Sequence, residues 1–154
     1  MDADTLRIVL IGALASALAL WVLSTFLFRM AGTWERELTE EDERDGTRAE
    51  RITLAQLGPF VTGRRDVKGG YQEFSGLAFG RGITLNRRDH GRASLLALGF
   101  PEAVAQKLDG EVMARLKLTL HDGIILDGLF EPQKVEFTHQ PPRVTGMHFL
   151  PGQR

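Results

Sequence analysis

The stretch IVLIGALASALALWVLSTFLF, residues Ile8–Phe28, decides how this chain is organised. It contains 21 consecutive residues without a charge, and its hydroxyl side chains are Ser16, Ser24 and Thr25. As a helix with a rise of ~1.5 Å per residue it would be ~31 Å long, which matches the hydrocarbon core of a bilayer. A helix in lipid satisfies its own backbone hydrogen bonds, so we expect one transmembrane helix over residues 8–28.

A cleaved signal peptide is the alternative interpretation of this stretch. Signal peptides begin with a positive segment, continue with about 7–15 apolar residues and end at a small-residue cleavage site. This chain begins with MDADTLR, where two aspartates accompany Arg7, and no cleavage-like site follows its longer apolar run. We therefore expect a retained anchor, with residues 1–7 as a short flank.

Arginines near the ends of the helix predict its orientation, because Lys and Arg are enriched on the cytoplasmic side. Only Arg7 precedes the helix, whereas Arg29, Arg36 and Arg44 follow it. This bias favours a cytoplasmic C-terminal domain on a protein of the bacterial inner (cytoplasmic) membrane. The absence of cysteine is compatible with either side of the membrane.

Residues 29–51 predict a charged, largely helical neck between the anchor and the folded domain. From residue 31 to residue 51 there are eight acidic residues and four arginines. Trp34 is expected at the membrane interface, and Glu40 is expected to pair with Arg44 on a short helix. The neck is interpreted as a solvated spacer, with an acidic docking site for a basic partner as the alternative.

Residues 52–154 predict a single β-rich extramembrane domain. They contain fourteen of the seventeen glycines, and short runs of Val, Ile, Leu, Phe and Thr alternate with turn residues. Such a pattern is typical of a small all-β domain. The fold class is therefore mainly β, with a barrel or sandwich of about seven to eight strands. One short helix is expected between Pro101 and Gly110.

The clearest predicted strand covers residues 111–120, where apolar residues occupy every second position. This alternation indicates one buried and one solvated face. A three-residue loop ending at Gly123 would pair Leu118 with Leu126 and keep both apolar faces together. The same register would place Lys117 opposite an aspartate, Asp127, on the outer face.

A second hairpin is predicted from an internal similarity. LAFGRGITL at residues 77–85 resembles LTLHDGIIL, which lies 41 positions later. By analogy, its three-residue loop would pair Phe79 with Ile83. The match indicates two related 41-residue units, 52–92 and 93–133, each ending in a hairpin. A third hairpin is expected from strands at 134–138 and 143–150.

A group of basic residues is the one candidate ligand site in the sequence. We expect one set in a loop of the first unit (Arg64, Arg65 and Lys68) and the other after the first hairpin (Arg87, Arg88 and Arg92). Guanidinium groups suit such a site because their geometry matches that of phosphate oxygens. If the loops converge, the group would bind a nucleotide or an anionic lipid headgroup. The alternative is that Asp66, Asp89 and the acidic neck neutralise these charges. The group comprises Arg64, Arg65, Lys68, Arg87, Arg88 and Arg92.

The sequence carries no signature of catalysis, a metal or a cofactor. It has no cysteine nucleophile, and its four histidines lack the spacing of a zinc site. The net charge of −1 does not suggest nucleic-acid binding. We therefore expect a non-enzyme without a metal or cofactor.

The function predicted from these observations is that of an accessory or scaffolding subunit of a membrane protein complex. Its expected partners are the bilayer and either another membrane protein or a second copy of the chain. Small residues four apart, Gly12 and Ser16, would allow close helix contact. The alternative function is a membrane-tethered sensor that binds a phosphate-bearing ligand through the arginine group.

Overall fold

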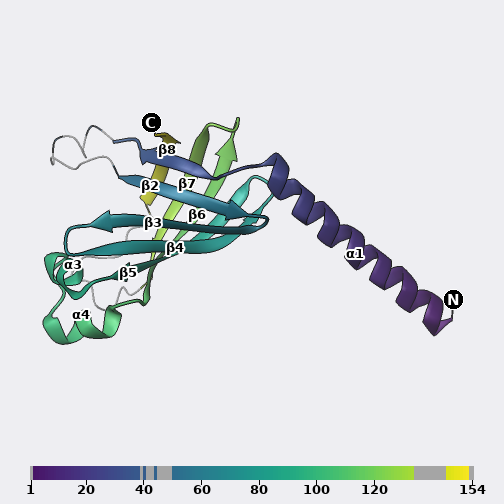
Figure 1. The fold of residues 1–154 in the computed structure, drawn as a ribbon, viewed down its shortest axis with the longest axis horizontal. Coiled ribbons are helices and arrows are strands. Elements are labelled where there is room, and N and C mark those ends of the chain that lie inside the picture. The colour runs from purple at the N-terminus through teal and green to yellow at the C-terminus, as the bar shows by residue number, and fades with distance from the viewer. Residues whose placement is uncertain (1, 39, 41–43, 45–49, 134–144, 153–154) are drawn as a thin grey trace.

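A computed structural model describes residues 2–38, 40, 44, 50–133 and 145–152. One long helix leads into a closed barrel of eight antiparallel strands, and two short helices lie at the end of the barrel opposite the long helix (Figure 1). The elements are α1 (Ala3–Leu27), β1 (Gly32–Arg36), β2 (Arg51–Leu57), β3 (Phe60–Val67), β4 (Gly70–Phe79), β5 (Gly82–His90), α3 (Arg92–Ala97), α4 (Glu102–Leu108), β6 (Val112–His121), β7 (Ile125–Pro132) and β8 (Thr145–Pro151).

The helix α1 projects from one end of the barrel and is long and apolar enough to cross a membrane. Asp2 caps its first turn, because its side chain accepts a hydrogen bond of 2.7 Å from the backbone N–H of Thr5. Hydrogen bonds from Thr5, through its side chain and then its backbone, lower the pKa of Asp2. None of the most apolar part of α1 is buried inside the chain, so that surface is left for another environment.

Pairing of the first and last strands closes the barrel. Every strand pairs antiparallel with its neighbour in sequence, and β1 also pairs with β8. Alternate side chains point inward, as the period of two requires. The interior is packed with Met30, Trp34, Ile52, Leu54, Val61, Phe74, Ala78, Ile83, Leu85, Leu116, Leu118, Leu120, Leu126, Met147 and Phe149. The predicted mainly β fold with seven to eight strands is confirmed.

The helices α3 and α4 form a second, smaller apolar cluster. Leu95 of α3 and Leu108 of α4 pack with Met113, which occupies an outward position at the start of β6. The predicted helix between Pro101 and Gly110 is confirmed as α4, whereas α3 was not predicted. These helices therefore cover a part of the outer barrel surface that would otherwise expose Met113.

The prediction that the folded domain begins only after a neck at residues 29–51 is wrong, because the first barrel strand lies within that range. Residues 32–36 are a barrel strand instead of part of a helical neck. Trp34 lies inside the barrel instead of at the membrane interface, because it faces inward from β1. Glu40 and Arg44 are helical and form the predicted ion pair, at 3.7 Å.

The β6–β7 hairpin has the predicted faces in a different register. Leu118 pairs with Gly128 instead of Leu126. Because this shift is two residues, every side chain stays on the predicted side of the sheet. The turn places Asp122 at φ 50° and Gly123 at φ 74°, so the expected left-handed conformation of Gly123 is confirmed.

The shift also changes the partner of Lys117. Its ammonium group donates to Glu131 at 2.9 Å, and the residue opposite it on β7 is Leu129. The predicted placement opposite Asp127 is wrong. The cross-strand ion pair is nevertheless retained on the outer face, because Glu131 lies two positions along from Leu129 and shares that face.

The β4–β5 hairpin differs from its prediction in the faces as well. Phe79 pairs with Gly82 across a two-residue turn instead of with Ile83. The shift of one residue reverses the faces of β4, whereas Ile83 and Leu85 of β5 stay buried as predicted. Ala78 is consequently buried, and Leu77 and Phe79 are exposed at the end of the barrel next to α1.

The two 41-residue units fold differently outside their hairpins. Residues 54–58 belong mainly to β2, whereas the matching residues 95–99 lie in α3 and the turn after it. Of the third predicted hairpin, β8 is present, and its partner at 134–138 lies outside the described residues. The internal similarity therefore corresponds to two hairpins and not to a repeated unit.

We predict that Gly128→Ala lowers the free energy of unfolding by about 1–3 kcal/mol, which is typical of overpacking. A Cβ at Gly128 would collide with the backbone carbonyl oxygen of Lys117 on β6. Gly146→Ala in the adjacent strand β8 is the matched control, because a Cβ there has no neighbour within 4 Å. Chemical unfolding of the full chain in detergent, followed by near-ultraviolet circular dichroism, measures both variants. Equal losses would contradict the close β6–β7 approach.

Candidate functional site

The six predicted basic residues do not form one site. Arg64 and Arg65 belong to β3 instead of a loop, and Arg87 and Arg88 belong to β5. Neighbouring residues in a strand point to opposite faces of the sheet. Each pair is therefore divided between the interior and the exterior of the barrel.

The outward arginines lie on either side of Glu73. Arg64 of β3 and Arg88 of β5 both pair with Glu73 of β4 in the sheet register. Arg64 forms an ion pair with Asp66 at 3.1 Å and lies over the Tyr71 ring at 3.9 Å. The Nη1 group of Arg88 donates to the carbonyl oxygen of Gly110 at 2.8 Å. Both guanidinium groups thus have partners within the barrel surface.

The inward arginines are neutralised by carboxylates at the end of the barrel away from α1. Arg87 contacts Asp89 through Nε at 2.9 Å, and its Nη2 group donates to Asp89 at 3.1 Å. The Nε contact is an ion pair without hydrogen-bond geometry, and Asp89 is only 2% exposed. Arg65 forms an ion pair with Glu50 at 3.1 Å.

The remaining two residues of the predicted group lie outside β3 and β5. Lys68 is exposed in the β3–β4 turn. Arg92 begins α3 and forms an ion pair with Glu102 of α4. The structure therefore divides the predicted ligand site among the barrel interior, its outer face, a turn and the short helices.

Among the described residues, side chains pack the space inside the barrel. A cavity of about 10 Å³ lies between Phe74, Arg87 and Phe149. A volume of ~10–15 Å³ is what a single water needs, so this cavity is too small for an organic ligand. Arg87 also lies over the Phe130 ring at 5.2 Å, which further packs this end of the interior.

We predict that Arg87→Ala lowers the free energy of unfolding by about 3–5 kcal/mol, because it leaves the Asp89 carboxylate buried without its cation. Arg64→Ala is the control, since the exposed Arg64–Asp66 pair contributes about 1 kcal/mol or less. Thermal and chemical unfolding of the full chain give both values. A loss of under 1 kcal/mol for Arg87→Ala would mean that Asp89 has another compensating partner.

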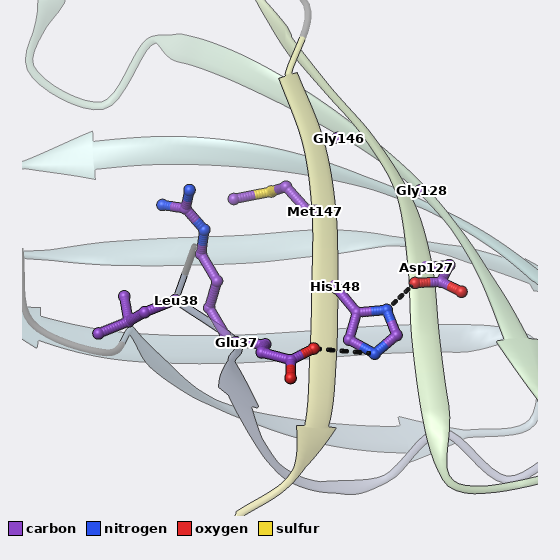
Figure 2. Close-up of a pocket in the computed structure, with 8 residues that line it drawn as sticks. Glu37, Leu38, Asp127, Gly128, Gly146, Met147 and His148 are labelled. Carbon is purple, nitrogen blue, oxygen red and sulfur yellow. Dashed lines mark hydrogen bonds and ion pairs between the residues drawn. The ribbon is translucent and has the colours of Figure 1, made fainter. Parts of the chain in front are cut away.

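A cleft on the outer face contains a histidine between two carboxylates. Figure 2 shows His148 of β8 between Glu37, which follows β1, and Asp127 of β7. The His148 Nε2 atom lies 3.3 Å from Glu37, and Nδ1 contacts Asp127. The cleft has a volume of about 470 Å³. His148 of β8 thus connects a side chain of β7 with one that directly follows β1.

The chemistry of this cleft is that of a cross-strand hydrogen bond between His148 and Asp127. The backbone N–H of Glu37 donates to the carbonyl of His148 at 2.8 Å, which continues the β1–β8 pairing beyond the end of β1. His121 approaches the other Asp127 oxygen at 3.9 Å. Within the described ranges no group of three or more His, Cys, Asp or Glu side chains has a metal-binding arrangement. This arrangement strengthens the barrel closure where β8 meets β7 and β1.

A side-chain connection made by a single amide group lies where α1 meets the barrel. Gln56 of β2 donates to the Thr25 carbonyl in the last turn of α1 at 3.2 Å and accepts from the Met30 N–H at 2.7 Å. It also donates to the Gly58 carbonyl at 3.1 Å. One amide side chain therefore satisfies backbone groups on both sides of the helix end, where helices lack internal partners.

Two tryptophans complete this junction. The indole N–H of Trp34 donates to the Met30 carbonyl at 2.9 Å inside the barrel. The indole N–H of Trp21 donates to the Ala78 carbonyl of β4 at 3.1 Å, and its ring lies 6.4 Å from that of Phe79. The roles of Gln56, Trp21 and Trp34 at this junction are not among those predicted from the sequence. The signal in the sequence was that two large apolar residues, Met30 and Trp34, follow the anchor directly and are available to enter a core.

We predict that Gln56→Leu lowers the free energy of unfolding by about 1–3 kcal/mol, because it leaves the Met30 N–H and the Thr25 carbonyl without their partner. Gln106→Leu on the exposed side of α4 is the matched control, with an expected change within about 0.5 kcal/mol. Thermal unfolding of the full chain in detergent provides the comparison. An equal effect of both substitutions would contradict the proposed connection between α1 and the barrel.

Comparison with known proteins gives no match: no protein-family model, no curated protein and no solved structure is significantly similar to this chain.

Proposed function

We propose that the protein is a single-pass membrane-anchored accessory or scaffolding subunit that presents a small non-enzymatic β-barrel. The observation that carries this proposal is the junction of an apolar, unburied α1 with a filled barrel. Gln56 and Trp21 attach the barrel directly to the helix. A barrel held in this way has a fixed position relative to the membrane, which suits a subunit that positions other components.

The filled interior supports a role for the outer surface. A protein that binds a small molecule inside a barrel needs a cavity, and the space near Phe74 holds about one water. Four of the six basic residues engage a carboxylate, namely Asp66, Asp89, Glu50 or Glu102. These contacts favour the accessory role over a phosphate sensor, because each such pair would have to be broken or shared to grip a phosphate.

The partner of this subunit is proposed to be another membrane protein or a second copy of the chain. Gly12 and Ser16 lie on one side of α1, where a second helix can approach closely. No atom lies within 4 Å of a Cβ built at Gly12, so this face is open within the chain. The arginine bias of Arg29 and Arg36 over Arg7 supports a cytoplasmic barrel at the inner membrane.

The anchor is tested with the full chain expressed in bacterial membranes. We predict that the protein remains in the membrane pellet after an alkaline wash. The double substitution Leu14→Arg and Leu18→Arg should release it, because each arginine at the centre of a helix costs about 2.5–3.5 kcal/mol on insertion. Leu98→Arg is the matched control in the exposed turn after α3, and it should remain in the pellet.

The accessory role is tested on the same membranes by extraction in a mild detergent. A constant ratio between this chain and a membrane-protein partner, or a defined homo-oligomer, is the expected result. A monodisperse monomer that stays in the pellet during the alkaline wash would retain the anchor and remove the accessory role.

A further inference from the structure

The contact between Trp21 and Ala78 fixes the depth of the barrel relative to the helix. Crossing the hydrocarbon core takes ~20 apolar residues, and Arg7 limits the apolar part of α1 on its N-terminal side, so this part extends from Ile8 to about Leu27. Trp21 is only ~20 Å along this span. Its hydrogen bond of 3.1 Å to the Ala78 carbonyl places the end of β4 beside this part of the span.

The adjacent β2–β3 turn lies at a similar depth. Gln56 bonds the Thr25 carbonyl, four residues beyond Trp21 on α1. The Ala78 N–H donates to the Pro59 carbonyl at 2.8 Å, which joins the two turns. The Arg81 carbonyl accepts from the Leu120 N–H at 2.7 Å, which brings the end of β6 to the same edge. Three turns therefore form one surface beside α1.

This surface, here called the apolar rim, exposes large hydrophobic side chains on all three turns. Leu57 is 82% exposed and Phe79 is 74% exposed, although burial of such side chains in water-soluble proteins is the rule. The remaining exposed large hydrophobic residues of the described barrel are dispersed over α3, its following turn, β7 and β8. The rim consists of Leu57, Phe60, Leu77, Phe79 and Ile124.

Two arginines border the apolar rim at the base of α1. A cleft of about 350 Å³ is lined by Arg29 and Arg81 together with Leu27 and Phe28. Asp122 also lines this cleft. The Arg81 guanidinium lies 5.5 Å from the centre of the Phe28 ring. Apolar side chains beside guanidinium groups match the boundary between acyl chains and headgroup phosphates.

We propose that the apolar rim inserts into the same leaflet of the bilayer that α1 leaves, with Arg29 and Arg81 at the level of the lipid phosphates. The inference rests on the anchor in the proposed function and extends it, because the barrel itself becomes a membrane-contacting element. The lipid is favoured as the occupant because the rim is continuous with α1, and Trp21 and Thr25 place it at membrane depth. A protein that covers the rim is the alternative outcome of the test.

The experiment uses single-cysteine variants of the full chain, which has no cysteine of its own. Phe79→Cys reports on the rim, Leu14→Cys on the anchor and Lys107→Cys on α4 at the opposite end of the barrel (Figure 1). Each variant carries an environment-sensitive fluorophore and is reconstituted into phosphatidylcholine vesicles, with and without phosphatidylglycerol. Quenching by lipids with a spin label in the acyl chain is compared with quenching by aqueous iodide.

The expected result is that the labels at Leu14 and Phe79 are quenched by the spin-labelled lipids several-fold more than the label at Lys107. The label at Phe79 should also be protected from iodide in both types of vesicle, because phosphate is common to both headgroups. Phe79 is largely exposed in the free chain, so its replacement removes no core packing.

Three results would change the conclusions in different ways. Quenching at Leu14 without quenching at Phe79 would overturn rim insertion, leave the anchor intact and assign the rim to a protein partner. Quenching at Phe79 without quenching at Leu14 would overturn the anchor and retain the rim as a peripheral membrane contact. Quenching at Phe79 only in phosphatidylglycerol vesicles would overturn apolar insertion in favour of attraction through the arginines.

Discussion

The structure depends on the pairing of β1 with both β2 and β8, directly after the helix ends. Only residues 28–31 separate α1 from β1. Because β1 must lie between two strands to close the barrel, these four residues have little freedom. Met30 enters the core, and Gln56 binds the backbone on both sides of the helix end. Closure of the barrel therefore also fixes the direction in which α1 leaves it.

This constraint gives the barrel two chemically different ends. Met30 and Trp34 fill the end next to α1, where the adjoining turns expose apolar side chains. The opposite end holds the buried Arg87–Asp89 pair and the Arg65–Glu50 pair. Desolvated charges require a partner, and exposed apolar side chains gain free energy when they are shielded from water. The asymmetry along the barrel axis therefore agrees with a membrane at the α1 end.

The sequence predicts the class of fold better than the individual strands. Alternation in β6 is strong enough to identify its buried face, because five apolar residues recur with a period of two. In β1 only Trp34 is buried, so the strand shows no alternation of apolar residues. Its charged neighbours therefore favoured the prediction of a helical neck, because nothing local indicates that this segment closes a barrel. The arginines of β3 and β5 were assigned to loops for the same reason, since glycine and charge conceal a strand whose stability comes from its neighbours.

The two hairpin registers show where arguments from burial alone fail. The β6–β7 register differs by two residues and keeps every face, because the buried leucines on both strands demand it. The β4–β5 register differs by one residue, which buries Ala78 and exposes Phe79 beside Trp21. The sequence-based pairing took water as the surroundings of the outer face, whereas under the proposed insertion of the apolar rim this turn lies in lipid. An exposed phenylalanine is unfavourable in the first environment and favourable in the second. The register therefore departs from the predicted faces at the turn that lies beside Trp21 of α1.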